Sequence, residues 1–295
     1  MNVFAAIGFF DGVHQGHRYL LWQLQQAAAA SGAVTMAVTF RDHPRTVLDP
    51  AFRPTLLTTT DERVALLREA GAERVEVLDF TPEMARLTAA EFMEHVLLPL
   101  GVRGLLMGFN HRFGSDRTTT FADTQAAGHR LGISVGRALP LEAGEDVSSS
   151  AIRRCVTAGL LDEASAMLGH HYSVAGDVVA GRQIGRTMGF PTANVAAPAD
   201  KLLPGNGVYA AWAKGDSLPQ PVAAVVNIGT RPTVEAHGRR TVEAHLIGFS
   251  GDLYGQRLTL DFVHKQRDEQ RFHSREQLQR RIEADVELCK SILMQ

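Results

Sequence analysis

The sequence predicts two domains in series: an α/β domain built on a parallel sheet, then a small β-barrel that ends in a helix. Three observations predict this order. The chain has 295 residues, about twice the length of an average domain. In its first half, apolar strand patterns alternate with helix patterns. After about residue 170, short strand patterns follow one another with Gly, Pro and Asn between them. The predicted domains are 1–168 and 169–295.

In the first half, the alternation predicts a doubly wound, Rossmann-like sheet with helices on both faces. Thr59 with Glu62 and Thr88 with Glu91 have the spacing of capping boxes, so each pair is expected to open a helix. Strands are expected at 3–8, 33–40, 74–78, 102–107 and 133–138, and helices at 15–30, 59–71, 88–101 and 121–131.

In the second half, two helices at 150–157 and 162–168 are expected before the strand-rich part begins. Short strands without intervening helices favour a closed or nearly closed barrel. A last helix is expected from Ser274, which forms a capping-box spacing with Gln277. Strands are expected at 172–179, 207–213, 222–227, 241–247 and 257–263.

Composition excludes several classes of function. With 30 Lys+Arg against 32 Asp+Glu the net charge is −2, so we expect no nucleic acid as partner. No Walker-type loop is present, and the only lysines are Lys201, Lys214, Lys265 and Lys290. Phosphate chemistry in the first 200 residues therefore has to use Arg, His, backbone N–H groups, helix N-termini or metal.

The chain is expected to act in the cytoplasm. Cys155 and Cys289 form no CxxC or metal-ligand spacing, and no basic residue precedes the first apolar segment as in a signal peptide. The longest uncharged stretch, 19–40, contains polar residues throughout and fits a helix, a turn and a strand better than a membrane span. No membrane partner is expected.

The segment 8–17 is the first candidate site, because it joins the first strand to the first helix. Here two imidazoles, His14 and His17, stand at a helix N-terminus, where free N–H groups and the helix dipole attract phosphate. The histidines are candidate catalytic residues. The phosphate-binding candidates are Gly8, Phe10, Asp11, Gly12 and Gly16. A zinc site or a plain capped helix start are the alternatives.

Two later segments favour the phosphate interpretation. Asn110 and Phe113 lie in a polar, Gly-containing loop directly after a predicted strand. Ser148 and Ser149 open a helix with Arg153 near its first turn, where hydroxyls and a guanidinium could hold distal phosphates. A serine run is by itself more often a simple helix cap.

These three motifs together resemble the adenylyltransferase module of bacterial bifunctional FAD synthetases, within the HxGH nucleotidylyltransferase superfamily. The resemblance implies that FMN attacks the α-phosphorus of ATP with Mg²⁺ assistance, giving FAD and pyrophosphate. It also implies that His14 and His17 contact the ATP phosphates, that Asn110 lines the nucleotide and flavin site, and that Ser148, Ser149 and Arg153 form a second phosphate motif.

The second candidate site begins with a Gly-rich segment that turns into an extended Pro-Thr-Ala-Asn run. On a strand, Thr192 and Asn194 would share one face and offer two oxygen atoms suited to Mg²⁺ with phosphates. The preceding amides could wrap the phosphates, although glycines alone would indicate only barrel corners. The phosphate-binding candidates are Gly181, Gly185, Arg186 and Gly189.

Glu243 is a candidate general base. It shares a strand face with His245, opposite the apolar Val242. A carboxylate facing a barrel mouth could take the proton of an alcohol that attacks a γ-phosphate. The alternative, an outward polar strand face, has equal support from periodicity.

This second motif set resembles the riboflavin kinase module, whose fold is a six-stranded antiparallel barrel with a C-terminal helix. The resemblance implies phosphoryl transfer from ATP to the riboflavin 5′-hydroxyl. It places Thr192 and Asn194 at the Mg²⁺ and phosphate positions and Glu243 as base. The segment before the last helix, with Arg267, Glu269 and Phe272, falls on the flavin side.

Together the two resemblances span nearly the whole chain and predict an enzyme that makes FMN from riboflavin and then FAD from FMN. ATP, riboflavin, FMN and FAD are the expected partners, with flavins as substrates and products and Mg²⁺ as cofactor. Three alternatives stay open: a single active module, a non-enzymatic flavin-binding sensor derived from this family, or a different adenylyltransferase fused to a barrel.

Overall fold

The computed structural model describes residues 2–49, 51–109, 114–116, 120–141, 147–181, 185–230 and 240–294, with only the backbone of Arg186 and Thr187. The chain divides into two compact units, Met1–Ser149 and Ser150–Gln295. Helices α6 (Ser149–Ala158) and α7 (Leu161–Leu168) are therefore grouped with the second unit, apart from the first residue of α6. The boundary between functional domains at 168/169 stays a prediction.

The first unit contains the predicted parallel sheet. Its five strands have the order β3-β2-β1-β4-β5, and every pair is parallel. β1 and β2 pair in register from Val3 opposite Val34 to Ile7 opposite Val38. The strands are β1 (Val3–Ile7), β2 (Val34–Phe40), β3 (Arg74–Leu78), β4 (Val102–Met107) and β5 (Ser134–Arg137).

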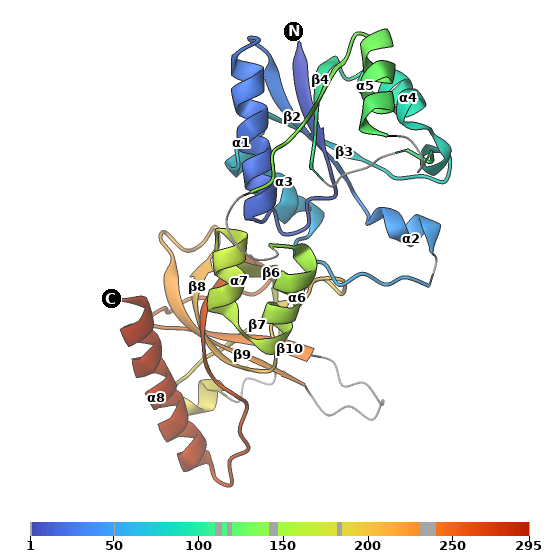
Figure 1. The fold of residues 1–295 in the computed structure, drawn as a ribbon. Helices are drawn as coiled ribbons and strands as arrows, with labels where there is room; N and C mark the ends of the chain where they lie inside the picture. Colours follow the sequence, from blue (N-terminus) through green and yellow to red (C-terminus); the bar gives the residue numbers. More distant parts are fainter. Residues whose placement is uncertain are drawn as a thin grey trace. The chain divides into compact units, whose positions relative to one another are not determined.

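Helices cover both faces of this sheet, as the doubly wound prediction requires (Figure 1). The helices are α1 (Gln15–Ala29), α2 (Pro44–Leu48), α3 (Thr60–Glu69), α4 (Ala89–Phe92) and α5 (Phe121–Arg130). Both predicted capping boxes are present, at Thr59–Glu62 and Thr88–Glu91. The sequence did not predict the short helix α2 or the continuation of α4 as a π-helical turn, η2 (Met93–Leu97). A 3₁₀ turn, η1 (Met84–Arg86), precedes α4.

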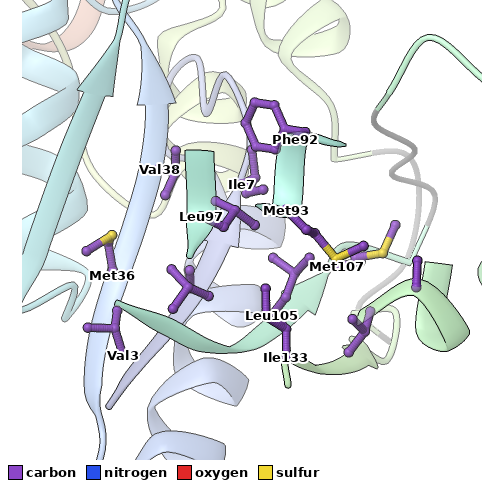
Figure 2. Packing of buried hydrophobic residues seen from close by; sticks show 14 of the residues in the cluster. Val3, Ile7, Met36, Val38, Phe92, Met93, Leu97, Leu105, Met107 and Ile133 are labelled. Atoms are coloured by element: carbon purple, nitrogen blue, oxygen red, sulfur yellow. The ribbon is translucent and has the colours of Figure 1, made fainter. Parts of the chain in front are cut away.

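Strand alternation sends successive side chains of β1 into two separate cores. Val3, Ala5 and Ile7 pack with residues of α4, η2 and α5, and Figure 2 shows Ile7 beside Phe92 and Leu97 in this cluster. Ala6 joins the opposite core, formed mainly by α1 and α3. The sheet is thus buried on both faces, which explains its nearly continuous apolar strands.

The strand order positions the first site. From β1 the chain winds to β2 and β3 on one side and then returns to β4 on the other side of β1. In such sheets ligands bind at the carboxyl ends of the strands, where the winding direction reverses. The loops after β1 and β4, which carry the predicted motifs, leave the sheet at this point.

The second unit is a closed barrel with the strand order β10-β7-β6-β11-β8-β9, all antiparallel. This confirms the six-stranded barrel. The strands are β6 (Tyr172–Val179), β7 (Ala193–Ala196), β8 (Gly207–Lys214), β9 (Val222–Thr230), β10 (Arg240–Leu246) and β11 (Arg257–Arg267). The sixth strand, β7, is the segment that periodicity described only as extended. A 3₁₀ turn, η3 (Gly185–Met188), precedes it.

The terminal helix α8 (Arg275–Leu293) packs on the outer surface of the barrel (Figure 1). Val286 and Cys289 of α8 form a cluster with Val208, Ala210 and Val225 of β8 and β9. Ser274 caps the helix by accepting a hydrogen bond from Gln277 N at 3.2 Å. The Gln277 side chain accepts from His273 N at 3.3 Å, where a full capping box would have it accept from Ser274 N. Within the described ranges, no helix has both the length and the apolar character needed to cross a membrane.

Candidate functional sites

The loop after β1 has an unusual backbone. Phe10 has φ 56° and Val13 has φ 40°, in the left-handed region that non-glycine residues rarely adopt. Each such residue costs on the order of 1–3 kcal/mol, and such strain concentrates at functional sites. Both side chains are buried and pack with α1, so tertiary contacts impose this conformation.

Asp11 anchors the loop from beneath. Its carboxylate is buried and accepts hydrogen bonds from Leu57 N at 3.0 Å, Thr58 N at 2.9 Å and Thr58 Oγ1 at 3.1 Å. Thr58 Oγ1 also accepts from Gly12 N at 3.1 Å. The residue predicted to bind phosphate therefore holds the loop in place through the segment before α3.

The two histidines form a stacked pair at the N-terminus of α1. Their ring centroids are 3.6 Å apart with an interplanar angle of 20°, and His17 also meets the edge of Phe10 at 5.2 Å. His14 is the N-cap residue, and its side chain makes no capping hydrogen bond. A methyl group at Gly16 would come within 3.2 Å of the His14 ring, so glycine leaves this imidazole its space.

His14 is 8% exposed, and this burial controls its charge. Burial lowers the pKa of the His14 imidazole from 6.5 to about 4, while the Asp11 carboxylate raises it in part. Its Nδ1 is buried and makes no hydrogen bond to any part of the chain that the structure describes. At neutral pH His14 is thus an uncharged imidazole with one N–H, at the N-terminus of α1.

The second phosphate motif reaches this loop through Ser149, whose Oγ donates to Asp11 O at 3.0 Å. Arg153 is half-buried one turn along α6 and belongs to the second unit, so its phosphate role stays a prediction. Asn110 and Phe113 lie outside the described residues. No group of three His, Cys, Asp or Glu side chains suited to a metal occurs in the described ranges, so the zinc alternative has no third ligand there.

The second site is a row of polar side chains across three barrel strands. Glu243 of β10 lies directly opposite Asn194 of β7 on one side and Asn227 of β9 on the other. Directly opposed residues on antiparallel strands share a face, with Cβ atoms about 4.5–5.5 Å apart. All three are half-buried. The row joins the base candidate to the metal candidate and adds Asn227, which is not among the site residues predicted from the sequence.

The register also decides which face Glu243 occupies. Asn227 alternates with the buried Ile228, and it lies opposite Val208, which packs against α8 on the outside of the barrel. Glu243 therefore lies on the outer face, while Val242 and Ala244 fill the interior. Periodicity left open whether Glu243 faces the barrel mouth or lies on an outward strand face, and the structure shows the outward face. The segments that contain Gly181 and Glu269 lie close to this outward face.

Two glycines let neighbouring segments come close to this row. A Cβ at Gly181 would lie 2.1 Å from Asn194 Nδ2, and one at Gly229 would lie 2.1 Å from Glu269 Oε1. Any side chain at either position would displace the polar group. Glu269 thus lies over β9, where its Oε2 accepts from Asn206 Nδ2 at 3.1 Å.

The remaining residues of the Gly-rich segment are only partly described. Gly185 and Arg186 lie in η3, and the side chain of Arg186 is outside the described part; Gly189 has φ 85° in the turn that follows. Thr192 is half-buried, with its methyl carbon 3.5 Å from where a Cβ at Gly185 would lie. His245 Nδ1 lies 2.9 Å from Pro191 O and so ties this segment to β10.

A pocket of about 490 Å³ adjoins Thr192 and was not predicted. It lies between β7, β10 and the loop before β11, and Phe249, Leu253 and Tyr254 are among its lining residues. The sequence pattern predicts strands at 241–247 and 257–263 and no site in the loop between them. Phe249, Leu253 and Tyr254 are large apolar residues in an otherwise polar, Gly-containing loop, and this composition could have indicated a pocket.

The segment before α8 is held to this helix by an ion pair. The Arg267 guanidinium forms a two-pronged ion pair with the buried Asp285 of α8, with Nη2 at 2.7 Å and Nε at 3.0 Å from the carboxylate. Its Nη1 donates to Asp268 O, and its carbon lies 5.9 Å from the Phe272 ring. The hydrogen bonds shown for Arg267 are structural, and its flavin role stays a prediction.

Comparison with known families matches both units. The FAD synthetase family model matches residues 1–151, and the riboflavin kinase family model matches residues 168–293. A Pseudomonas fluorescens protein, the bifunctional riboflavin kinase/FMN adenylyltransferase, is 38% identical over 98% of this chain and 92% of its own length. The chain belongs to the bifunctional riboflavin kinase/FMN adenylyltransferase family.

A second relative and one solved structure also align with this chain over most of their length. The bifunctional riboflavin kinase/FMN adenylyltransferase of Escherichia coli K12 is 37% identical, with 95% of this chain and 89% of that protein covered. A crystal structure described as a macrolide-efflux protein from Streptococcus pneumoniae has a TM-score of 0.89, at 28% identity, over 98% of this chain and 94% of that one. That description belongs to the S. pneumoniae protein; both units here match flavin-nucleotide families.

Proposed function

We propose that the barrel unit phosphorylates riboflavin with ATP to give FMN, and that the α/β unit transfers the adenylyl group of a second ATP to FMN. The observation that carries this proposal is that each family match falls on a unit with its own polar site: the His14–His17 loop in one and the Asn194–Glu243–Asn227 row in the other.

In the kinase reaction, we propose Glu243 as the general base. Its carboxylate accepts the proton of the riboflavin 5′-hydroxyl while that oxygen bonds to the γ-phosphorus of ATP and the bond to ADP breaks. Asn194 and Asn227 flank it and orient the hydroxyl and phosphate oxygens by hydrogen bonding. Because the three side chains are half-buried, their electrostatic interactions with a substrate are stronger than they would be in bulk water.

The donor set of this site fits Mg²⁺. Hydroxyl and amide oxygens are ligands that Mg²⁺ accepts alongside nucleotide phosphates. Gly181 lies close to the Asn194 side chain, so the Asn194 amide is next to backbone N–H groups that could bind phosphate. Thr192 and Asn194 would hold the ion, and when bound it would neutralise charge on the transferred phosphoryl group.

We propose the pocket beside Thr192 as the place for the nucleotide base. Its apolar and aromatic lining, next to a candidate phosphate site, is typical of sites that bury a planar heterocycle. The flavin is then expected at the other end of the row, toward Glu269 and Phe272, with Arg267 holding that segment against α8.

In the adenylylation reaction, a phosphate oxygen of FMN attacks the α-phosphorus of ATP and pyrophosphate leaves, without a covalent enzyme intermediate. His14 and His17 are proposed to donate N–H groups to the phosphate oxygens as negative charge develops. A neutral His14 can fill this role, because the uncharged imidazole keeps one N–H donor. Asn110 and Phe113 are proposed to meet the flavin, as in the resemblance.

The direct test incubates the purified chain with riboflavin, ATP and Mg²⁺ and separates the flavins by chromatography. We expect FMN first and FAD after it, with pyrophosphate released in the second step. FMN without FAD would leave a single active module, and no turnover would support the flavin-binding sensor.

Glu243→Gln separates the two steps. We expect phosphorylation of riboflavin to fall by about 10²–10⁴-fold, while FAD still forms when FMN is supplied. Glu283→Gln, at an exposed position on α8, is the matched control and should leave both steps unchanged. Phosphorylation at the normal rate in the Glu243 variant would refute its assignment as base.

Two free thiols, Cys155 and Cys289, fit a reducing compartment, and the cytoplasm stays our prediction for the site of action.

A further inference from the structure

Arg63 of α3 is an arginine with no accessible surface, and one of the largest fully buried side chains described. Its Nη2 donates to Phe40 O at 2.5 Å, Arg41 O at 3.2 Å and Thr60 Oγ1 at 3.3 Å. The first two acceptors are at the carboxyl end of β2. One nitrogen of the guanidinium thus holds the chain where it leaves the sheet.

The rest of the guanidinium is incompletely satisfied. Nε and Nη1 are buried and make no hydrogen bond to any of the residues that the structure describes. Burial lowers the pKa of Arg63, and the carboxylates of Asp11 and Asp42 raise it only in part. A buried cation with unused donors costs stability, and apolar residues often replace such groups without loss. Stability alone does not account for this arginine.

Its position links Arg63 to the adenylylation loop. The guanidinium carbon lies 4.3 Å from the centroid of the Phe9 ring, and Phe9 directly precedes the strained Phe10. Phe9 O accepts from Thr39 Oγ1 at 3.0 Å, and its ring meets that of His43 at 4.7 Å. Arg63 therefore contacts the ends of both β1 and β2 where the loop begins.

Charge gives the same indication. The first 200 residues contain no lysine, so the α/β unit has no ammonium group to place near nucleotide phosphates. A guanidinium held under the loop offsets the negative charge of the buried Asp11 carboxylate, which would otherwise oppose phosphate at the α1 N-terminus. Because it is buried, this charge is weakly screened by solvent.

We propose that Arg63 is a positioning residue for adenylyl transfer: through Phe9 and the strand ends it fixes the loop that carries His14 and His17, and it supplies a buried positive charge behind the phosphate site. This inference rests on the proposed adenylylation of FMN by the first unit. Arg63 acts through the loop and does not touch the substrate.

The test compares Arg63→Met, Arg63→Lys and, as matched control, Arg68→Met at an exposed position of the same helix. FAD formation from FMN and ATP is measured by chromatography, together with riboflavin phosphorylation by the same preparation and thermal unfolding. We expect Arg63→Met to lower the kcat of adenylylation ten- to hundredfold, because misplacing catalytic groups by about 1 Å costs on the order of 10²-fold.

The kinetic pattern distinguishes positioning from a structural role. In Arg63→Met, kcat should fall more than the KM for ATP rises, phosphorylation should be unchanged, and the unfolding transition should stay cooperative. Arg63→Lys retains the charge and should recover adenylylation to within about threefold of wild type, and Arg68→Met should equal wild type.

Three results would overturn the inference. The first is a folded Arg63→Met variant whose adenylylation kcat is within about twofold of wild type. The second is an Arg63→Met variant that loses the cooperative unfolding transition of the first unit. The third is an Arg63→Lys variant whose adenylylation kcat is no higher than that of Arg63→Met. A wild-type chain that makes no FAD from FMN would instead overturn the proposed function itself, and the inference with it.

Discussion

The buried, neutral His14 predicts a stability loss at mildly acidic pH. Its pKa of about 4 in the folded chain lies below the ordinary 6.5, so between these values the unfolded chain binds a proton that the folded chain does not. Unfolding is therefore favoured as the pH falls. The free energy of unfolding falls by about 3 kcal/mol in total once the pH is below 4, because each unit of pKa shift corresponds to 1.36 kcal/mol. About 2 kcal/mol of this decrease has occurred by pH 5.

The measurement compares wild type with His14→Asn, whose side chain does not titrate in this range. Urea unfolding at pH 7 and pH 5 gives the free energy of unfolding of each, and other titrating groups cancel in the difference between the two proteins. The wild type should lose about 2 kcal/mol more than the variant. NMR titration of the His14 ring checks the cause directly, because its signal should show a pKa of about 4 instead of 6.5.

Equal pH dependence in the two proteins would refute the burial argument, as would a His14 signal that titrates near pH 6.5. A further consequence concerns activity. If His14 works as a neutral donor, adenylylation should not require its protonation and should persist from pH 8 down to about pH 6.

Two more predictions concern the barrel unit. Gly181→Ala should lower riboflavin phosphorylation at least tenfold without changing FAD formation from FMN, because the added Cβ would lie 2.1 Å from Asn194 Nδ2; an unchanged rate of FMN production would contradict the close approach. Asp285→Asn should lower the free energy of unfolding by about 3 kcal/mol, because it leaves the Arg267 guanidinium without its buried partner. The control Asp268→Asn, at an exposed carboxylate, should change that free energy by less than about 1 kcal/mol.

Local patterns were enough to find much of the fold. Thr59 and Thr88 cap helices as their spacing predicted, because a capping box needs only four consecutive residues. The continuation of α4 as a π-helical turn escaped prediction, since no capping motif in the sequence marks the change to i→i+5 hydrogen bonds.

The candidate sites were predicted only in part. The sequence places His14 at a helix start, but its burial and its stacking on His17 depend on Phe10 and on the α1 core. On the same grounds, Arg63 is indistinguishable from an exposed helix arginine. Its burial comes from packing against the ends of β1 and β2, which lie more than 20 residues away.

By itself, then, the sequence determined the two architectures and their order, and it predicted the segments that carry chemistry, because these follow from short-range periodicity, capping and motif spacing. Only the tertiary structure decided which groups meet. Strand register brings Asn194, Glu243 and Asn227 into one row on the outer face of the barrel. Desolvation lowers the pKa of His14 and keeps its imidazole neutral at pH 7. Both effects depend on contacts between residues far apart in the chain, and a local pattern carries no information about such contacts.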